Sequence, residues 1–275
     1  MRPLSNGTAA ATTMLLLLAG AAGASGPPSG PVKKCAADAV VSGAGCMDKY
    51  EAGVWRVPDA TTTNRALVVK IQQGTATVTS LTAGGATPLG TLTDDYAPCA
   101  HSGQHCTNDI YALSLPGVTP SGFITWFQAQ QACANSGKRL PSSAEWQAAV
   151  AGTPDPGPDN GSTDCNTASR FAVALTGSRS SCVSSPGAFD MVGNLFEWVA
   201  DWVPRSTGGG AWRPGVSATG DTQGLVGAYE RGAPGALLRG GDFLYAGGTF
   251  AGPLAVLGAV EPSTSLNEVG FRCAR

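Results

Sequence analysis

The sequence predicts a loop-rich α+β domain stabilised by disulfide bonds. The chain has 275 residues, and its 38 glycines and 19 prolines make up about a fifth of them, which is typical of a backbone rich in turns and irregular loops. It also has 8 cysteines. Two helix-start patterns in the middle of the chain stand among short β-branched runs, so both kinds of secondary structure are expected.

Two short helices are expected in the middle of the chain. Thr125 and Gln128 form a capping-box pattern ahead of "WFQAQQACANSG", and Gly137 is a natural C-terminal stop. Ser142 and Glu145 repeat the pattern ahead of "WQAAVAG". The sequence therefore predicts a pair of helices joined by "KRLPS".

Extended structure is expected nearer the N-terminus. From Cys46 the segment "CMDKYEAGVW" roughly alternates apolar and polar residues, as a half-buried strand does. Residues 59–93 are rich in Thr, Gly and Ala and contain the β-branched runs "ALVVKI" and "TATVTSL". We expect this segment to be a hairpin or an insertion in extended structure.

The N-terminus has the form of a signal peptide. Arg2 precedes the apolar run Met14–Ala22, and Ala22-Gly23-Ala24 has the small-x-small form of a cleavage site. The run is about half the length of a membrane-spanning helix, and a buried N-terminal helix is the alternative interpretation. We expect residues 1–24 to be removed near Ala24 and the protein to be secreted or periplasmic, with no transmembrane segment. Residues 25–44 are then a linker and residues 45–275 the domain.

The charge balance argues against a nucleic-acid partner. The formal net charge is −2, the pI is near 5.6, and no basic cluster is longer than Lys33-Lys34.

The cysteines are expected to form disulfides, because an even number in an exported chain is typical of bridges rather than thiols. Eight cysteines allow 105 pairings, so the sequence alone does not choose among them. Closeness along the chain favours Cys35–Cys46, Cys99–Cys106 and Cys165–Cys182, which would leave Cys133 to reach Cys273.

Five stretches occur in an order that carries a family resemblance: "MDKYEA" (47–52), "ITWFQAQQACANSGKRLPSSAEWQAAV" (124–150), "DMVGNLFEW" (190–198), "LRGGDF" (238–243) and "GFRCA" (270–274). With them, residues 45–275 resemble the formylglycine-generating-enzyme family, also called sulfatase-modifying factors. The resemblance implies a variant of the C-type-lectin fold. It also implies a bridge between Cys133, on the first helix, and Cys273, in the final strand.

The resemblance assigns a calcium site to "DMVGNLFEW". The implied ligands are the side chain of Asp190, the backbone carbonyls of Gly193 and Leu195, and the carboxylate of Glu197. Calcium takes six to eight oxygen ligands in a flexible shell, which a tight Gly-Asn turn flanked by two acids can supply. On spacing alone, solvated or capping carboxylates are the alternative, and Asp201 keeps that interpretation.

A second calcium site is implied at Asn166 and the carbonyl of Thr167. The rest of that site has no counterpart, because residues 168–182 contain no acid.

The catalytic chemistry of the family depends on residues that this chain lacks. Catalytic members oxidise a cysteine of a sulfatase to formylglycine with O2 and a copper(I) ion held by two thiolates, the soft ligands that copper(I) prefers. Counted from Gly240-Gly241, those positions are Tyr245 and Phe250, and no cysteine lies between Cys182 and Cys273. Copper is therefore not expected.

His101 and His105 are the only histidines, and both lie in "CAHSGQHC" (99–106). Two cysteines and two histidines at this spacing could hold zinc, whereas a disulfide loop with two exposed histidines suits an exported chain better. No G-x-S-x-G motif accompanies them, which argues against hydrolysis.

Binding is the function that remains. Phe243, Tyr245 and Phe250 stand among small residues after the R-G-G motif, where related lectin-like proteins bind ligands; the alternative is that they belong to the core. We expect a calcium-stabilised, non-catalytic domain that binds a peptide, protein or glycan ligand. The alternative function is an oxidoreductase of the family, acting on a protein cysteine with an altered metal site.

Overall fold

The structure is a computed structural model, and it describes residues 34–155, 159–168, 171–203, 209–211, 222–224, 234–244 and 250–275. The predicted signal peptide and Tyr245 lie outside these ranges. The longest helix within them has 10 residues, well under the length that a bilayer span requires.

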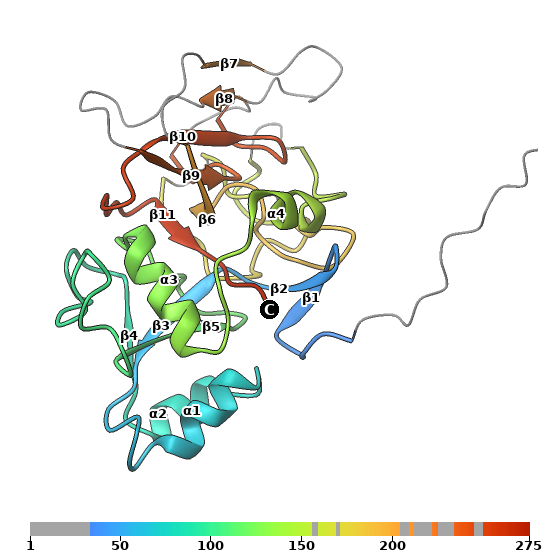
Figure 1. The fold of residues 1–275 in the computed structure, drawn as a ribbon. Helices are drawn as coiled ribbons and strands as arrows, with labels where there is room; N and C mark the ends of the chain where they lie inside the picture. The colour runs from blue at the N-terminus through green and yellow to red at the C-terminus, as the bar shows by residue number, and fades with distance from the viewer. Residues whose placement is uncertain are drawn as a thin grey trace, which may run out of the picture. The chain divides into compact units, whose positions relative to one another are not determined.

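The described elements form three sheets and four helices (Figure 1). In chain order they are β1 Ala39–Ser42, β2 Gly45–Asp48, β3 Ala52–Arg56, α1 Arg65–Gln72, α2 Val78–Ala83, β4 Thr87–Leu89, β5 Ile110–Ser114, α3 Trp126–Asn135, α4 Ser143–Ala149, β6 Phe196–Val203, β7 Gly209–Ala211, β8 Thr222–Gly224, β9 Gly235–Arg239, β10 Val256–Val260 and β11 Val269–Phe271. The fold is thus α+β and loop-rich, as predicted.

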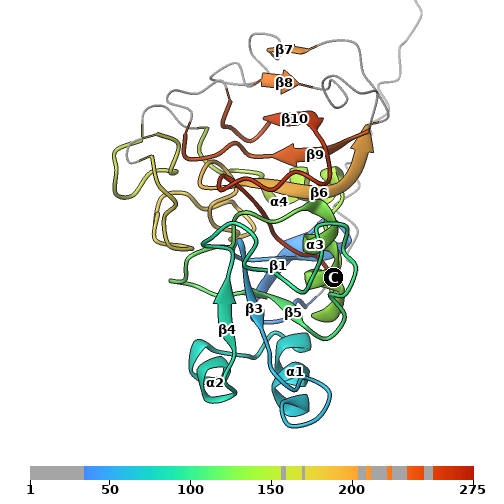
Figure 2. The same ribbon diagram turned by 90° about the vertical axis from the view of Figure 1, so that its left-hand side faces the viewer.

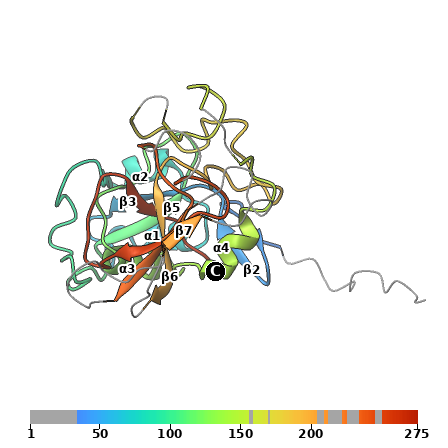
Figure 3. The same ribbon diagram turned by 90° about the horizontal axis from the view of Figure 1, so that it is seen from above.

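The largest sheet has the strand order β11-β6-β9-β10-β8-β7, and the smaller ones are β4-β3-β5 and β1-β2 (Figure 2). Seen from above, a long irregular connection between α4 and β6 lies beside the largest sheet (Figure 3). This connection ends in the loop that leads into β6.

Both predicted helices are confirmed as α3 and α4, with their capping boxes. The side chains of Thr125 and Ser142 accept from the backbone N–H groups of Gln128 and Glu145, and those two side chains accept from the cap N–H groups in return. Gly137 follows α3 with φ +68°, a left-handed conformation that ends a helix at little cost for glycine.

The extended structure predicted over residues 59–93 is wrong for most of the segment. Its two β-branched runs fall on helices α1 and α2, and only β4 is extended. Leu67 and Ile71, one helical turn apart, are buried in a core cluster with Trp55 and Tyr111, and Leu81 of α2 joins them. Burial of this face outweighs the modest strand preference of valine and isoleucine.

The single half-buried strand expected from Cys46 is also wrong. The segment forms two strands, β2 and β3, interrupted at residues 49–51. All of β2 and most of β3 are buried, so the expected alternation in exposure is absent from these strands.

Four disulfides account for all eight cysteines: Cys35–Cys46, Cys99–Cys106, Cys133–Cys273 and Cys165–Cys182. The three pairs favoured by closeness and the pair implied by the resemblance are confirmed. The Cys133–Cys273 bridge joins α3 to Cys273, the residue next to Arg272. The two cysteines are 140 residues apart in the sequence.

Candidate functional site

The loop that leads into β6 is held in a tight, partly left-handed conformation. Asp190, Gly193 and Asn194 all have positive φ, between 56° and 73°. A Cβ on Gly193 would lie 2.4 Å from the carbonyl oxygen of Asn166, so this close approach of two backbones requires glycine.

Asn194 joins this loop to two other segments. Its side-chain oxygen accepts from the Asn166 amide at 2.9 Å and from the Ala174 backbone N–H at 2.8 Å, and its amide donates to Glu51. Glu51 also accepts from the Leu195 N–H at 3.0 Å. Glu51 immediately precedes β3, so the loop is fixed to the sheet by a buried carboxylate.

Glu197 lies within β6, beside the parallel strand β11 that ends just before Arg272. The Arg272 Nε lies 2.9 Å and 2.8 Å from the two carboxylate oxygens of Glu197, and the Trp146 indole N–H donates to one of them at 2.7 Å. Both charged side chains are at most 1% exposed. The predicted calcium ligand Glu197 is therefore also half of a buried ion pair.

Three carboxylates, Glu51, Asp190 and Glu197, form what we call the buried acidic cluster. Burial raises the pKa of Asp190 to about 6 although the Gly177 N–H donates to it at 2.6 Å. Burial, followed by repulsion from Asp190 and Glu197, raises the pKa of Glu51 well above its usual range. Arg272 acts on all three acids and Arg179 also acts on Asp190, so the carboxylates of the cluster outnumber the cations near them.

The buried acidic cluster fits a calcium ion in its charge and in the chemistry of its donors. Its carboxylate and carbonyl oxygens are the hard ligands that calcium takes, and one dication would offset the excess of acids. In the described ranges no group of three or more His, Cys, Asp or Glu side chains is close enough to hold a metal, so backbone carbonyls would have to complete the shell. Asp190 and Glu197 would supply its carboxylates, beside the turn that contains Gly193 and Leu195.

Asn166, the residue implied for a second calcium ion, already has a cationic partner. Its amide oxygen accepts from Arg179 at 3.1 Å, and Arg179 also pairs with Asp159 at 3.0 Å. These charged side chains are at most 4% exposed. A guanidinium thus supplies positive charge here, and the role of Asn166 as a calcium ligand stays a prediction.

Of the three aromatic residues predicted to form a ligand surface, Tyr245 lies outside the described residues, and Phe243 and Phe250 differ in burial. Phe243 is buried and lines a cavity of about 280 Å³, whereas Phe250 is 48% exposed and does not line it. Two phenylalanines that sequence reasoning missed, Phe123 and Phe171, line the same cavity, which we call the phenylalanine pocket. Phe171 is 63% exposed. Nothing in its sequence neighbourhood indicates this role, because the pocket combines five segments that are distant in the sequence.

The histidine loop is a disulfide loop, and its zinc interpretation is wrong. Cys99 and Cys106 are bonded to each other and have no thiolate to offer a metal. His101 lies 2.6 Å from the Asp94 carboxylate in an exposed pair.

The fold and these sites define a disulfide-bonded α+β domain with a buried acidic cluster. Residues 63–275 match the model of the Sulfatase-modifying factor enzyme 1-like domain. The chain therefore belongs to the sulfatase-modifying-factor family, whose domain is a variant of the C-type-lectin fold.

Two kinases contain a related segment. The chain is 37% identical over 85 residues to the serine/threonine-protein kinase Pkn1 of Chlamydia trachomatis and 36% identical over 81 residues to pkn1 of Chlamydia caviae. Each match covers 29% of this chain and 13% of the kinase.

Similar solved structures include the P3c and U1 variants of the Major Tropism Determinant. They are 17% and 18% identical with TM-scores of 0.44 and 0.45, and each match covers 86% of this chain and 52% of the other.

Proposed function

We propose that the chain is an exported member of the family that binds a protein or peptide ligand and does not oxidise cysteine. The observation that carries the proposal is the bonding state of the cysteine sulfurs. All eight cysteines are in disulfides, and Tyr245 and Phe250 stand where the resemblance puts the copper thiolates. Without a thiolate pair the chain lacks the soft ligands for copper(I).

The phenylalanine pocket supports a ligand-binding role. Phe123, Phe171 and Phe243 give it aromatic walls, and the polar residue Asn267 also lines it. A volume of about 280 Å³ suits one or two apolar side chains of a ligand rather than a whole cofactor. The exposure of Phe171 makes it the aromatic group that a partner would cover.

Export is supported by the disulfides together with the N-terminal apolar run. Four bridges are typical of a protein that matures in an oxidising compartment. N-terminal sequencing of the mature protein is expected to start near Ser25. A mature chain that retains Met14–Ala22 would contradict cleavage near Ala24.

A structural calcium ion is part of the proposal. Asp190 and Glu197, with the carbonyls of Gly193 and Leu195, would hold the ion, which would supply the positive charge that the buried acidic cluster lacks. The chain's own part is to fix these groups through Asn194 and Arg272. The ion would stabilise the fold and take no part in chemistry.

The test has a catalytic arm and a binding arm. The protein is incubated with copper(I), O2 and a Cys-x-Pro-x-Arg peptide, and mass spectrometry follows the cysteine; it is then applied to peptide and glycan arrays. We expect no conversion, and retention on peptides with apolar side chains. Turnover of the cysteine would favour the oxidoreductase alternative, and retention on glycans alone would contradict the peptide ligand.

Two matched variants locate the binding site. Phe171→Ala should weaken binding of a retained peptide about 10- to 30-fold, as loss of an aromatic anchor does. Phe250→Ala, an exposed phenylalanine outside the pocket, should leave the affinity unchanged. The opposite pattern would move the ligand surface to Phe250.

A further inference from the structure

Two walls of the phenylalanine pocket have a strained backbone. In the described part of the chain, eight residues other than glycine have a positive φ, and six of them are Asp, Asn or His, which tolerate this conformation best. The other two are Phe123, with φ 52°, and Phe171, with φ 50°, and both line the pocket. A bulky residue in the left-handed region is an outlier, and such outliers cluster at functional sites.

Hydrogen bonds from other segments hold both walls in this conformation. The Phe123 N–H donates to the Leu266 carbonyl at 2.8 Å, and the Ser265 hydroxyl donates to the Phe123 carbonyl at 2.6 Å. On the other wall, the Asn166 amide donates at 2.9 Å to the carbonyl of Ala172, the residue next to Phe171. A strained backbone persists only where its surroundings determine it in this way, so the pocket is formed before a ligand binds.

Asn194 fixes the wall of Phe171 relative to that of Phe243. Its backbone carbonyl accepts from the Phe243 N–H at 3.1 Å, and its side-chain oxygen accepts from the Ala174 N–H at 2.8 Å. The loop that leads into β6 therefore connects two of the aromatic walls.

The pocket opens among exposed apolar side chains. In the described ranges the two most exposed large hydrophobic residues are Leu92, at 68%, and Phe171, at 63%. Leu92 follows the lining residue Thr91, and the exposed Leu266 precedes the lining residue Asn267. All the residues that line the pocket are uncharged. A ligand that fills the pocket would therefore meet further apolar groups at its rim.

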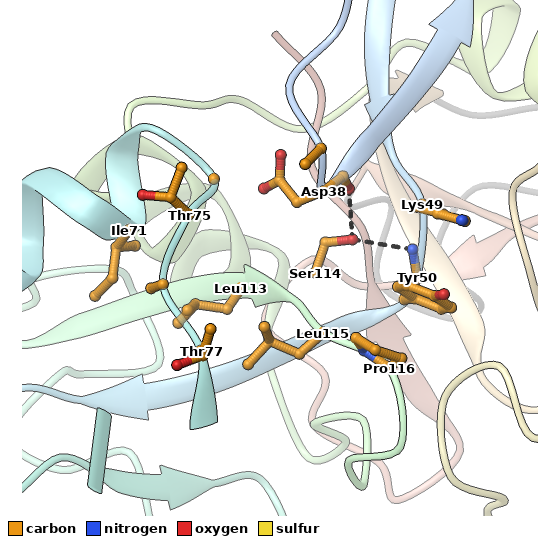
Figure 4. Close-up of a pocket in the computed structure, with 13 residues that line it drawn as sticks. Asp38, Lys49, Tyr50, Ile71, Thr75, Thr77, Leu113, Ser114, Leu115 and Pro116 are labelled. Atoms are coloured by element: carbon orange, nitrogen blue, oxygen red, sulfur yellow. Dashed lines mark hydrogen bonds between the residues drawn. The ribbon is translucent and has the colours of Figure 1, made fainter. Parts of the chain in front are cut away.

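A larger cavity, of about 470 Å³, lies between the turn after α1 and the end of β5 and differs in both respects (Figure 4). Among the described residues that line it, Tyr50 is the one aromatic residue, and the one left-handed residue is Gly74, where no side chain is strained. Figure 4 shows the Lys49 ammonium directed away from Ile71 and Leu113. Aromatic walls with a strained backbone thus distinguish the phenylalanine pocket.

We propose that the phenylalanine pocket holds one aromatic side chain of an extended peptide segment, and that apolar residues two positions to either side of it lie on Leu92 and Leu266. The inference rests on the peptide-binding function proposed above and specifies its ligand. Aromatic walls favour an aromatic anchor, and an uncharged lining disfavours a charged one. In an extended segment, residues two apart point to the same side, so the flanking side chains face the rim.

Titration of the full-length protein with capped pentapeptides tests the anchor. Acetyl-Leu-Ala-Phe-Ala-Leu-amide should bind about 2- to 12-fold more tightly than the same peptide with Leu at its centre, because aromatic pairs add to the effect of buried area. The peptide with Glu at its centre should not bind. Equal affinities for Phe and Leu, tighter binding of Glu, or no binding of any pentapeptide would overturn the inference.

The flanking residues are tested with alanine in place of the two outer leucines of the peptide, which should weaken binding. Leu92→Ser should reduce this difference between the Leu and Ala flanks and preserve the preference for a central Phe. Val69→Ser, which removes an exposed apolar residue of α1 outside the pocket, should change neither. Equal effects of the two variants would contradict the role of Leu92.

Thermal unfolding tests the strain without any ligand. Because Phe171 is exposed, its truncation loses little packing, and glycine adopts a positive φ without steric cost. Phe171→Gly should therefore melt about 2–4 °C above Phe171→Ala. Leu175 is exposed in the same connection and has no positive φ, so Leu175→Gly should melt below Leu175→Ala. The same order at both positions would show that Phe171 is not strained.

The outcomes separate this inference from the proposed function. If the array retains peptides but the pentapeptides show no preference for a central Phe, the ligand class is wrong and the peptide-binding function stands. If the array retains no peptide and no pentapeptide binds, both are wrong.

Discussion

The carboxylate of Glu197 faces the guanidinium of Arg272 in the core, with Nε 2.8 and 2.9 Å from its two oxygens. The two residues are 75 positions apart in sequence, and the parallel pairing of β6 with β11 brings them together. The pair lies beside the loop that the family resemblance assigns to calcium, so the carboxylate predicted as a calcium ligand is also half of a buried ion pair.

Glu197→Gln should destabilise the protein by about 3–5 kcal/mol, because it removes the charge of the one carboxylate that is hydrogen-bonded to a buried guanidinium. Urea unfolding at pH 7 measures the loss. The matched control is Arg139→Met, which breaks the more exposed pair with Glu145 and should cost less than about 1 kcal/mol. If the two variants lose similar amounts of unfolding free energy, burial does not make the Glu197–Arg272 pair more stabilising than the exposed pair.

Asp190→Ala should lower the melting temperature in calcium and change it little in chelator. If the proposed site binds calcium, the ion at about 100 times its dissociation constant should add about 2.7 kcal/mol of stability to the wild-type protein, and the variant should lose that gain. Without calcium the variant removes a carboxylate that burial already disfavours.

Asp201→Ala is the control for the calcium experiment, since Asp201 accepts from the Ser143 N–H at the start of α4. Asp201→Ala should lower the melting temperature by the same amount in calcium and in chelator. Equal losses for Asp190→Ala in the two conditions would refute its role as a ligand.

Removal of the Cys133–Cys273 bridge by a double alanine substitution should cost about 5 kcal/mol, since the chain-entropy model assigns more stabilisation to longer loops. The loop closed here spans 140 residues. The same substitution at Cys35–Cys46, which closes 11 residues, should cost about 3 kcal/mol. Thermal unfolding compares them, and a larger loss for the shorter loop would contradict the entropic origin.

Glu145 should contribute to stability in a pH-dependent way. The hydrogen bonds from Arg139 lower the pKa of Glu145 from 4.5 to about 2. Because the folded pKa is the lower one, the stabilisation is present above about pH 4.5 and is lost as the pH falls through about 2.

Glu145→Gln should therefore be less stable than the wild type at pH 7, by less than about 1 kcal/mol because the pair is partly exposed. The difference should vanish near pH 2. Urea unfolding between pH 7 and pH 2 measures it, and a difference that persists at pH 2 would contradict the ion pair as its source.

The sequence by itself determined the features that depend on neighbouring residues. The capping boxes at Thr125 and Ser142 located α3 and α4, because a cap is made within a single turn of backbone. Three disulfides were favoured by short separation, and the order of five motifs identified the family, including the long bridge from Cys133 to Cys273.

Only the tertiary structure decided the features that depend on distant contacts. The runs around Val68 and Val78 are β-branched, yet they are helical because Leu67, Ile71 and Leu81 pack on the core. The two pockets and the Glu197–Arg272 pair combine segments far apart in the chain. Local preferences of the backbone are small beside the free energy of burying an apolar face or pairing a buried charge, and that burial is set by the whole fold.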